Sequence, residues 1–209
     1  KEAPDAKYII VSNPVDIMTY VFTKISGLPE NQIMGSGTIL DTARLRYGLS
    51  EHFKVAQGNI HAYVFGEHGD TSFIPWTGAY ISGLSTDEYY EEMKAHGKDV
   101  KPLDKEAMLE YVQKSGGKVI AKKGATFYAV SATVCQLVGL ILAASDSLAT
   151  VSSMLHGEYG IEDVCLSTLT LVGPNGIQGK VQMRMNKEEV ALLKKSADAL
   201  KEVIAQIEL

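Results

Sequence analysis

Apolar positions in the first part of the chain alternate between short continuous runs and helical spacing. The run at residues 8–11 predicts a buried strand, and the spacing over residues 15–25 predicts a helix directly after it. Residues 28–30 predict a turn, which is followed by a short strand near Ile33. A second helix is expected over residues 40–49, so strands and helices alternate through this segment.

The middle of the chain has weaker patterns. A strand is expected over residues 60–65. Ser85 and Glu88 have the spacing of a capping box, which predicts that a helix starts there. The polar residues 96–105 predict a surface connection that leads into a further helix over residues 106–113.

The last part of the chain contains a long apolar stretch at residues 125–149. Residues 122–126 predict the start of the longest helix, and we expect it to be buried, because polar residues interrupt it too often for a membrane span. Strands are expected over residues 149–156, 164–172 and 179–185. Residues 173–176 predict the turn between the last two strands, and a capping box at Asn186 predicts a terminal helix that reaches Ile207.

Composition narrows the class of protein. Hydrophobic residues make up 45% of the 209 residues, which is ample for a core, and the length allows one domain or one and a half. The net charge of −5 brings no basic patch, so we expect neither a nucleic-acid partner nor a membrane. Cys135 and Cys165 lie in apolar surroundings without the spacing of metal ligands, which predicts reduced core residues, no metal site and a cytoplasmic protein.

The segment 66–70 (GEHGD) places a histidine between two glycines after a predicted strand. Glycines allow a sharp turn and the close approach of another molecule, so His68 is displayed at the end of the strand. Histidine changes its charge near neutral pH and therefore suits proton transfer. The alternative is a turn histidine held by a neighbouring carboxylate.

Two further segments carry polar residues that suit a site. In the segment 36–46 (SGTILDTARLR), Asp41 and Arg44 are three residues apart and share a face of the predicted helix. In the segment 11–16 (VSNPVD), Asn13 follows a predicted strand, at the end where open α/β sheets bind ligands. The alternatives are a surface ion pair for the first segment and a helix cap for the second.

Together, these three segments resemble the lactate/malate dehydrogenase family in their order and spacing, and the resemblance covers essentially the whole chain. It implies an α/β part followed by an α+β part: the C-terminal remnant of a Rossmann NAD-binding domain over residues 1–38, then the substrate domain over residues 39–209. NAD is the implied cofactor. The chain contains no G-x-G-x-x-G fingerprint, so we expect that most of the cofactor domain precedes residue 1 and that residues 1–209 alone are inactive.

The chemistry of a 2-hydroxy acid dehydrogenase assigns roles to the three segments. His68 is the natural base for the hydroxyl proton, and Arg44 offers the planar fork that binds a carboxylate. The resemblance implies that Asp41 fixes the tautomer of His68 and that Asn13 and Thr126 contact the substrate. It also implies a set of residues against the nicotinamide of NAD: Val11, Asn13, Ser36 and Leu40.

The substrate class is less closely defined. Glu67 and Thr126 resemble the lactate type of the family, which implies lactate and pyruvate as substrates, in glycolysis or fermentation. The alternatives are malate or a larger 2-hydroxy acid and, from another class, a non-catalytic fragment that acts only through oligomer contacts.

Two other basic side chains point away from the predicted site. Arg46 is two residues after Arg44 on the helix, and His61 is an odd number of residues before His68 on the strand. By resemblance, these positions match a pair that binds fructose 1,6-bisphosphate across a subunit interface, within a homotetramer. The alternative is a surface arginine and an ordinary interface histidine.

Overall fold

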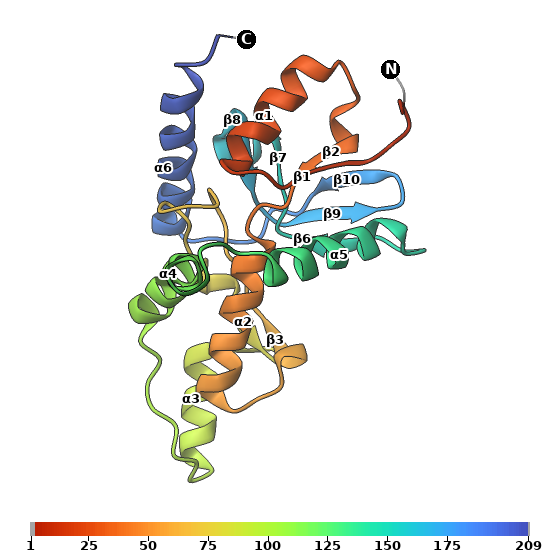
Figure 1. Cartoon of the computed structure of the whole chain (residues 1–209). Coiled ribbons are helices and arrows are strands. Elements are labelled where there is room, and N and C mark those ends of the chain that lie inside the picture. Colours follow the sequence, from red (N-terminus) through yellow and green to blue (C-terminus); the bar gives the residue numbers. More distant parts are fainter. Residues whose placement is uncertain (1–2, 209) are drawn as a thin grey trace.

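The computed structural model describes residues 3–208 and contains three small sheets and six helices within that range. Figure 1 shows that the first sheet, α1 and α6 form the upper part of the molecule, where both ends of the chain lie. Helix α2 runs downward from this part, and α3 and β3 lie at the lower end. Helix α4 lies between the two parts, beside α2.

The first sheet joins segments from both ends of the chain. Its order is β1 (Tyr8–Ile10), β2 (Ile33–Gly35), β7 (Ser152–His156) and β8 (Glu162–Ser167). β1 and β2 are parallel and are connected by α1 (Val15–Ser26), whereas β7 pairs antiparallel with both of its neighbours. The predicted domain boundary between residues 38 and 39 remains a prediction.

The other elements complete the two parts of the molecule. The second sheet has the order β10 (Gly176–Lys180), β9 (Thr170–Gly173) and β6 (Ser147–Ala149), and the third has the order β3 (Ile60–His61), β4 (Tyr80–Ile81) and β5 (Leu84–Ser85). The remaining helices are α2 (Ile39–Phe53), α3 (Thr86–Ala95), α4 (Lys105–Lys123), α5 (Tyr128–Leu142) and α6 (Lys187–Ile204). No helix within residues 3–208 has the length and apolar character needed to cross a bilayer.

The strongest local signals in the sequence are confirmed. The elements predicted before residue 50 are all present, within four residues of their expected ends. Both capping boxes form: Ser85 Oγ accepts the Glu88 amide at 3.2 Å while the Glu88 carboxylate accepts the Ser85 amide at 2.8 Å, and Asn186 does the same with Glu189. These patterns depend on neighbours in the sequence, so sequence alone can predict them.

The prediction for the apolar stretch is wrong in two respects. Helix α5 has 15 residues and is shorter than α4, which has 19 and continues ten residues past its predicted end. Helix α5 is also not buried: Tyr128 and Leu142 are each 78% exposed, and Cys135, predicted in the core, is exposed. Apolar composition does not show whether another element covers a helix. The prediction for Cys165, which is fully buried, is confirmed.

Several predicted strands have different bounds. Of the strand expected over residues 60–65, only Ile60 and His61 form a strand, β3. Phe65 makes an isolated bridge to Phe73. The strand over residues 164–172 divides into β8 and β9, and that over residues 149–156 divides into β6 and β7, because the chain changes sheet between them. The last strand, β10, starts at Gly176 and ends at Lys180, since two residues are enough for the turn after β9.

The main core cluster lies behind the segment that carries His68. Phe65 is fully buried against Leu155 of β7, Leu166 of β8 and Leu193 of α6. Burying such side chains contributes roughly 1.5–3 kcal/mol each. The 66–70 segment therefore begins at a rigid position of the core.

Candidate active site

A tight turn carries His68 out of the core. Gly66 has a φ of +93°, and a Cβ added there would lie 2.8 Å from Ser196 Oγ, so a residue with a side chain would be strained. The Gly66 amide donates to the carbonyl of Ser167 at 3.0 Å, and the Ser167 amide donates back to the Gly66 carbonyl at 3.1 Å. The start of the turn is thus fixed to the end of β8.

Helix α2 is fixed against the strand segment that precedes this turn. Thr38 Oγ1 donates to the carbonyl of Val64 at 2.5 Å, and Thr42 Oγ1 accepts the Val64 amide at 3.0 Å. Thr38 is the N-cap of α2, Thr42 lies in its first turn next to Asp41, and both threonines are buried. The two hydrogen bonds therefore set the distance between Asp41 and His68.

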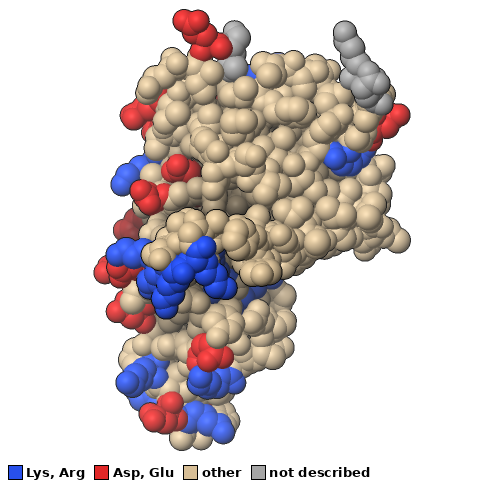
Figure 2. Space-filling model, in the orientation of Figure 1, with Lys and Arg blue, Asp and Glu red and all other residues tan. Residues whose placement is uncertain are grey.

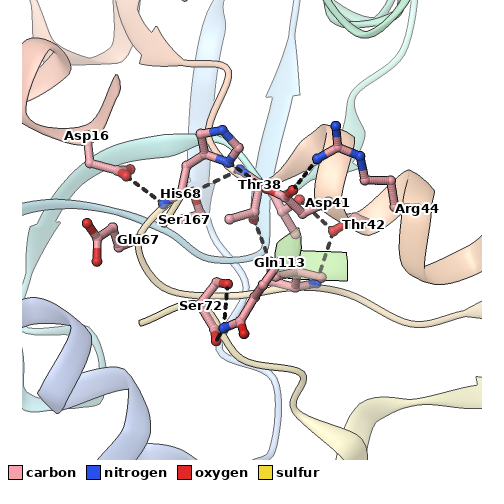
Figure 3. A network of polar contacts seen from close by, with 12 residues as sticks. Asp16, Thr38, Asp41, Thr42, Arg44, Glu67, His68, Ser72, Gln113 and Ser167 are labelled. Atoms are coloured by element: carbon pink, nitrogen blue, oxygen red, sulfur yellow. Dashed lines mark hydrogen bonds and ion pairs between the residues drawn. The ribbon is translucent and has the colours of Figure 1, made fainter. Parts of the chain in front are cut away.

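Asp41 bridges the other two predicted catalytic side chains (Figure 3). Its Oδ2 lies 2.6 Å from His68 Nδ1, and its Oδ1 accepts Arg44 Nη1 at 3.0 Å. The prediction that Asp41 and Arg44 share a face of the helix is confirmed. The two side chains also form the ion pair that the alternative interpretation expected. The hydrogen bond that His68 donates to the Asp41 carboxylate raises the pKa of His68, against the opposing effect of burial.

Two hydrogen bonds hold the main chain of the turn from behind. The amide of His68 donates to Asp16 Oδ2 at 2.7 Å, and the amide of Glu67 donates to Ser196 Oγ at 2.7 Å. No local pattern predicts a role for Asp16 or Ser196, because each is far from His68 along the chain. An acid in the first turn of an apolar helix is ordinarily explained by the helix dipole.

The predicted substrate residues line one cleft of about 200 Å³. Asn13, Asp41, Arg44, His68 and Thr126 all contribute to its walls. Further lining residues that the sequence did not identify come mainly from α4 and α5: Gln113, Gly116, Gly117, Ile120 and Val130. These residues have no recognisable motif, so only the packing of α4 and α5 beside α2 identifies them.

A smaller cavity of about 50 Å³ adjoins this cleft and contains all four residues predicted to contact the nicotinamide. It is lined by Val11, Asn13, Ser36, Gly37, Leu40, His68, Val130 and Thr133. Apolar side chains can contact the face of a nicotinamide ring, and the side chains of Ser36 and Asn13 can bond its carboxamide. The residues present therefore fit the nicotinamide end of NAD.

Positive charge gathers beside the cleft. Figure 2 shows Lys and Arg side chains over α4, whereas much of the upper part of the same face is uncharged. Helix α4 contributes five lysines: Lys105, Lys114, Lys118, Lys122 and Lys123. Lys105 and Lys114 are ion-paired with Asp87 and Glu110, and the positive charge of the other three lysines favours an anion at this face despite the net negative charge of the chain.

Arg46 and His61 lie outside this cleft, as predicted from their spacing. Arg46 Nε donates to the carbonyl of Ala62 at 3.1 Å, and its guanidinium lies 5.0 Å from the centre of the Tyr63 ring. It lines a separate cavity of about 300 Å³, and His61 is exposed on β3. Within the described residues, no group of three or more His, Cys, Asp or Glu side chains is arranged to hold a metal ion.

Asp41→Asn is expected to lower the pKa of His68, because a neutral amide stabilises the imidazolium less than a carboxylate does. Since the folded protein raises this pKa, protonation of His68 contributes stability that is present at low pH and lost as the pH rises through the raised pKa. NMR titration of the histidine rings measures the shift. Asp87→Asn, which removes an exposed ion-paired carboxylate, is the control. An unchanged His68 titration in Asp41→Asn contradicts the assignment.

The chain matches two family models and several curated relatives. The lactate/malate dehydrogenase NAD binding domain matches residues 1–35, and the lactate/malate dehydrogenase alpha/beta C-terminal domain matches residues 38–208. L-lactate dehydrogenase of Acetivibrio thermocellus is 45% identical over 205 residues, which are 98% of this chain and 64% of the relative. L-lactate dehydrogenase 1 of Clostridium acetobutylicum is 44% identical over 207 residues, which are 99% of this chain and 65% of the relative.

Solved structures are similar over most of the chain. L-lactate dehydrogenase from Clostridium thermocellum has a TM-score of 0.87 and 37% identity over 96% of this chain and 65% of its own. MGS-M5, a lactate dehydrogenase enzyme from a Medee basin deep-sea metagenome library, has a TM-score of 0.88 and 31% identity. The match covers 93% of this chain and 61% of that structure's chain. These matches confirm the predicted order of a short NAD-binding part and a substrate domain. The chain belongs to the lactate/malate dehydrogenase family.

Proposed function

We propose that this chain carries the substrate site of an NAD-dependent L-lactate dehydrogenase, which interconverts L-lactate and pyruvate. The observation that carries the proposal is the arrangement of His68, Asp41 and Arg44 around one cleft. In this cleft, a proton-transfer group with a fixed orientation lies beside a guanidinium. The oxidation of a 2-hydroxy acid needs the first group for its hydroxyl proton and the second for its carboxylate. The curated relatives that match nearly the whole chain are named L-lactate dehydrogenase.

His68 moves the proton. Because Nδ1 is held by Asp41, Nε2 is the ring nitrogen that can meet the substrate oxygen. In the oxidation of lactate, neutral His68 accepts the hydroxyl proton at Nε2, and Asp41 stabilises the imidazolium that forms. In the reduction of pyruvate, protonated His68 donates that proton to the keto oxygen, and its raised pKa favours the required form at neutral pH.

Arg44 binds the substrate carboxylate. Only one of its guanidinium nitrogens, Nη1, bonds Asp41, and the planar group has further N–H donors that can form two parallel bonds with a carboxylate. Asn13 and Thr126 line the same cleft, where both side chains can contact the substrate. Together, these groups orient the substrate with its oxygen towards His68.

The smaller cavity holds the nicotinamide of NAD in this proposal. Val11 and Leu40 provide apolar contact with the ring, while Ser36 and Asn13 provide polar contact with its carboxamide. When bound, the cofactor supplies hydride transfer to and from the substrate carbon. The two ligands would meet at the four residues that line both cavities: Asn13, Leu40, His68 and Val130.

Substitutions in the complete gene product test the proposal through pyruvate reduction. His68→Ala is expected to lower kcat about 10²–10⁴-fold, because the proton-transfer group is lost. Arg44→Lys is expected mainly to raise KM for pyruvate, because an ammonium cannot form the paired bonds of a guanidinium.

The matched controls are His96→Ala and Arg184→Lys, since both residues are exposed and outside the cleft. Wild-type-like activity of His68→Ala contradicts the proposal. A wild type that prefers oxaloacetate to pyruvate indicates the malate alternative. A wild type without activity towards any 2-keto acid indicates the non-catalytic alternative.

The finer part of the proposal concerns regulation and assembly. We propose a cytoplasmic homotetramer of glycolysis or fermentation, in which Arg46 and His61 bind fructose 1,6-bisphosphate. The position of both residues outside the substrate cleft supports this, as does the cavity beside Arg46. An effector bound there would not compete with pyruvate.

Fructose 1,6-bisphosphate is expected to lower KM for pyruvate in the wild type, and the double variant Arg46→Gln, His61→Gln is expected to lose this response. Pyruvate saturation curves with and without the effector measure this response. A wild type that does not respond, or a double variant that responds unchanged, shows that the two residues are ordinary surface or interface residues.

A further inference from the structure

We propose that Gln113 is a positioning residue for His68: its side-chain amide ties the second half of the loop that carries His68 to α4, and so fixes the histidine relative to the α4 wall of the cleft. This inference deepens the proposed function and rests on it only in that His68 is the proton-transfer group.

The loop that carries His68 runs from Phe65 to Phe73, which close it with two main-chain hydrogen bonds of 2.9 and 3.0 Å. Before His68, two main-chain amides of the loop bond to β8 and α6. After His68, the next two residues, Gly69 and Asp70, are exposed, and a glycine allows many backbone conformations. The second half of the loop therefore needs an anchor of its own.

The side chain of Gln113 provides this anchor. Its Nε2 donates to the carbonyl of Ser72 at 2.9 Å and to the carbonyl of Asp70 at 3.1 Å, and the Ser72 hydroxyl lies 3.3 Å away. Figure 3 shows Gln113 beside Ser72. A side-chain amide nitrogen has two N–H donors, which matches two carbonyl acceptors. The Ser72 amide donates to the Gly69 carbonyl at 3.2 Å, so Gln113 holds a turn that its own hydrogen bond closes.

Gln113 lies on the face of α4 that lines the cleft. The residues three, four and seven positions later share this helical face and line the same cleft: Gly116, Gly117 and Ile120. The preceding residue, Val112, is fully buried in a cluster that contains Leu45 and Leu49 of α2. Gln113 thus joins the loop to a helix that is itself fixed against α2, the helix that carries Asp41.

Three connections therefore fix the walls of the cleft relative to one another. Asp41 joins α2 to the ring of His68, the apolar cluster joins α2 to α4, and Gln113 joins α4 to the loop. Without the third connection, the loop beyond His68 can shift against the α4 wall while the bond to Asp41 persists. Arg44 is held by Asp41, so the loss of Gln113 leaves the carboxylate anchor in place. The expected defect is in proton transfer and not in substrate binding.

Three substitutions of Gln113 in the complete gene product separate its N–H donors from its shape and charge. Gln113→Met removes the donors without adding a charge and is expected to lower kcat for pyruvate reduction about 10-fold, with little change in KM, because a misplaced reacting group can cost up to about 10²-fold. Gln113→Glu keeps the shape but not the donors and should lower kcat as well. Gln113→Lys keeps N–H donors at this position and should retain a kcat near that of wild type.

Amide hydrogen exchange tests the anchor without turnover. The Ser72 amide should exchange faster in Gln113→Met than in wild type, whereas the Gly66 amide, which is bonded to β8, should exchange at the same rate in both. Gln182→Glu is the matched control, since Gln182 is exposed and outside the cleft, and it should change neither kcat nor the exchange of Ser72. The fold of each variant is checked by its circular dichroism.

An unchanged kcat in folded Gln113→Met overturns the proposal. A kcat that falls equally in Gln113→Met and Gln113→Lys also overturns it, because the N–H donors are then not the cause. If Gln113→Met does not fold, the other two variants decide: a lower kcat in Gln113→Glu than in Gln113→Lys supports the proposal, and equal values overturn it. An inactive wild type in which the exchange of Ser72 depends on Gln113 contradicts the proposed function while supporting the anchor.

Discussion

The hydrogen bond between His68 Nδ1 and Asp41 Oδ2 is the interaction on which the rest of the site depends. It joins a turn to a helix from a different part of the chain, and it orients the imidazole so that Nε2 is available to a substrate. Much of the surrounding structure keeps these two atoms together. Thr38 and Thr42 hold α2 to the strand segment before the turn, and the core around Phe65 holds that segment in place.

The charges of the site balance one another within a small volume. The Asp41 carboxylate bonds the His68 imidazole through one oxygen and the Arg44 guanidinium through the other. Asp16 adds a second negative charge beneath the turn, where burial makes that charge costly. A protonated His68 offsets this cost. The protonation state that the proposed reduction of pyruvate requires is thus also the state that best pairs the buried carboxylates.

The side chains that line the cleft could be predicted from the sequence because each lies in a short local pattern. Asn13 follows a strand, Asp41 and Arg44 share a helical face, and His68 lies between glycines. The roles of Asp16 and Ser196 could not be predicted, since they depend on contacts with residues that are distant along the chain. The predicted burial of α5 is wrong, because an apolar sequence specifies a preference for burial and not the element that provides it. The strand bounds failed where the chain passes from one sheet to another, which no local pattern marks.

In the proposed function, Arg44 and His68 act on the same ligand. A crystal structure of the complete gene product with NADH and oxamate, an unreactive analogue of pyruvate, tests this arrangement. The oxamate carboxylate is expected to form two bonds with the Arg44 guanidinium, and its amide oxygen is expected to accept a hydrogen bond from His68 Nε2. Oxamate bound outside this cleft, or bound in it without contact to both side chains, would show that the two residues do not act on one ligand.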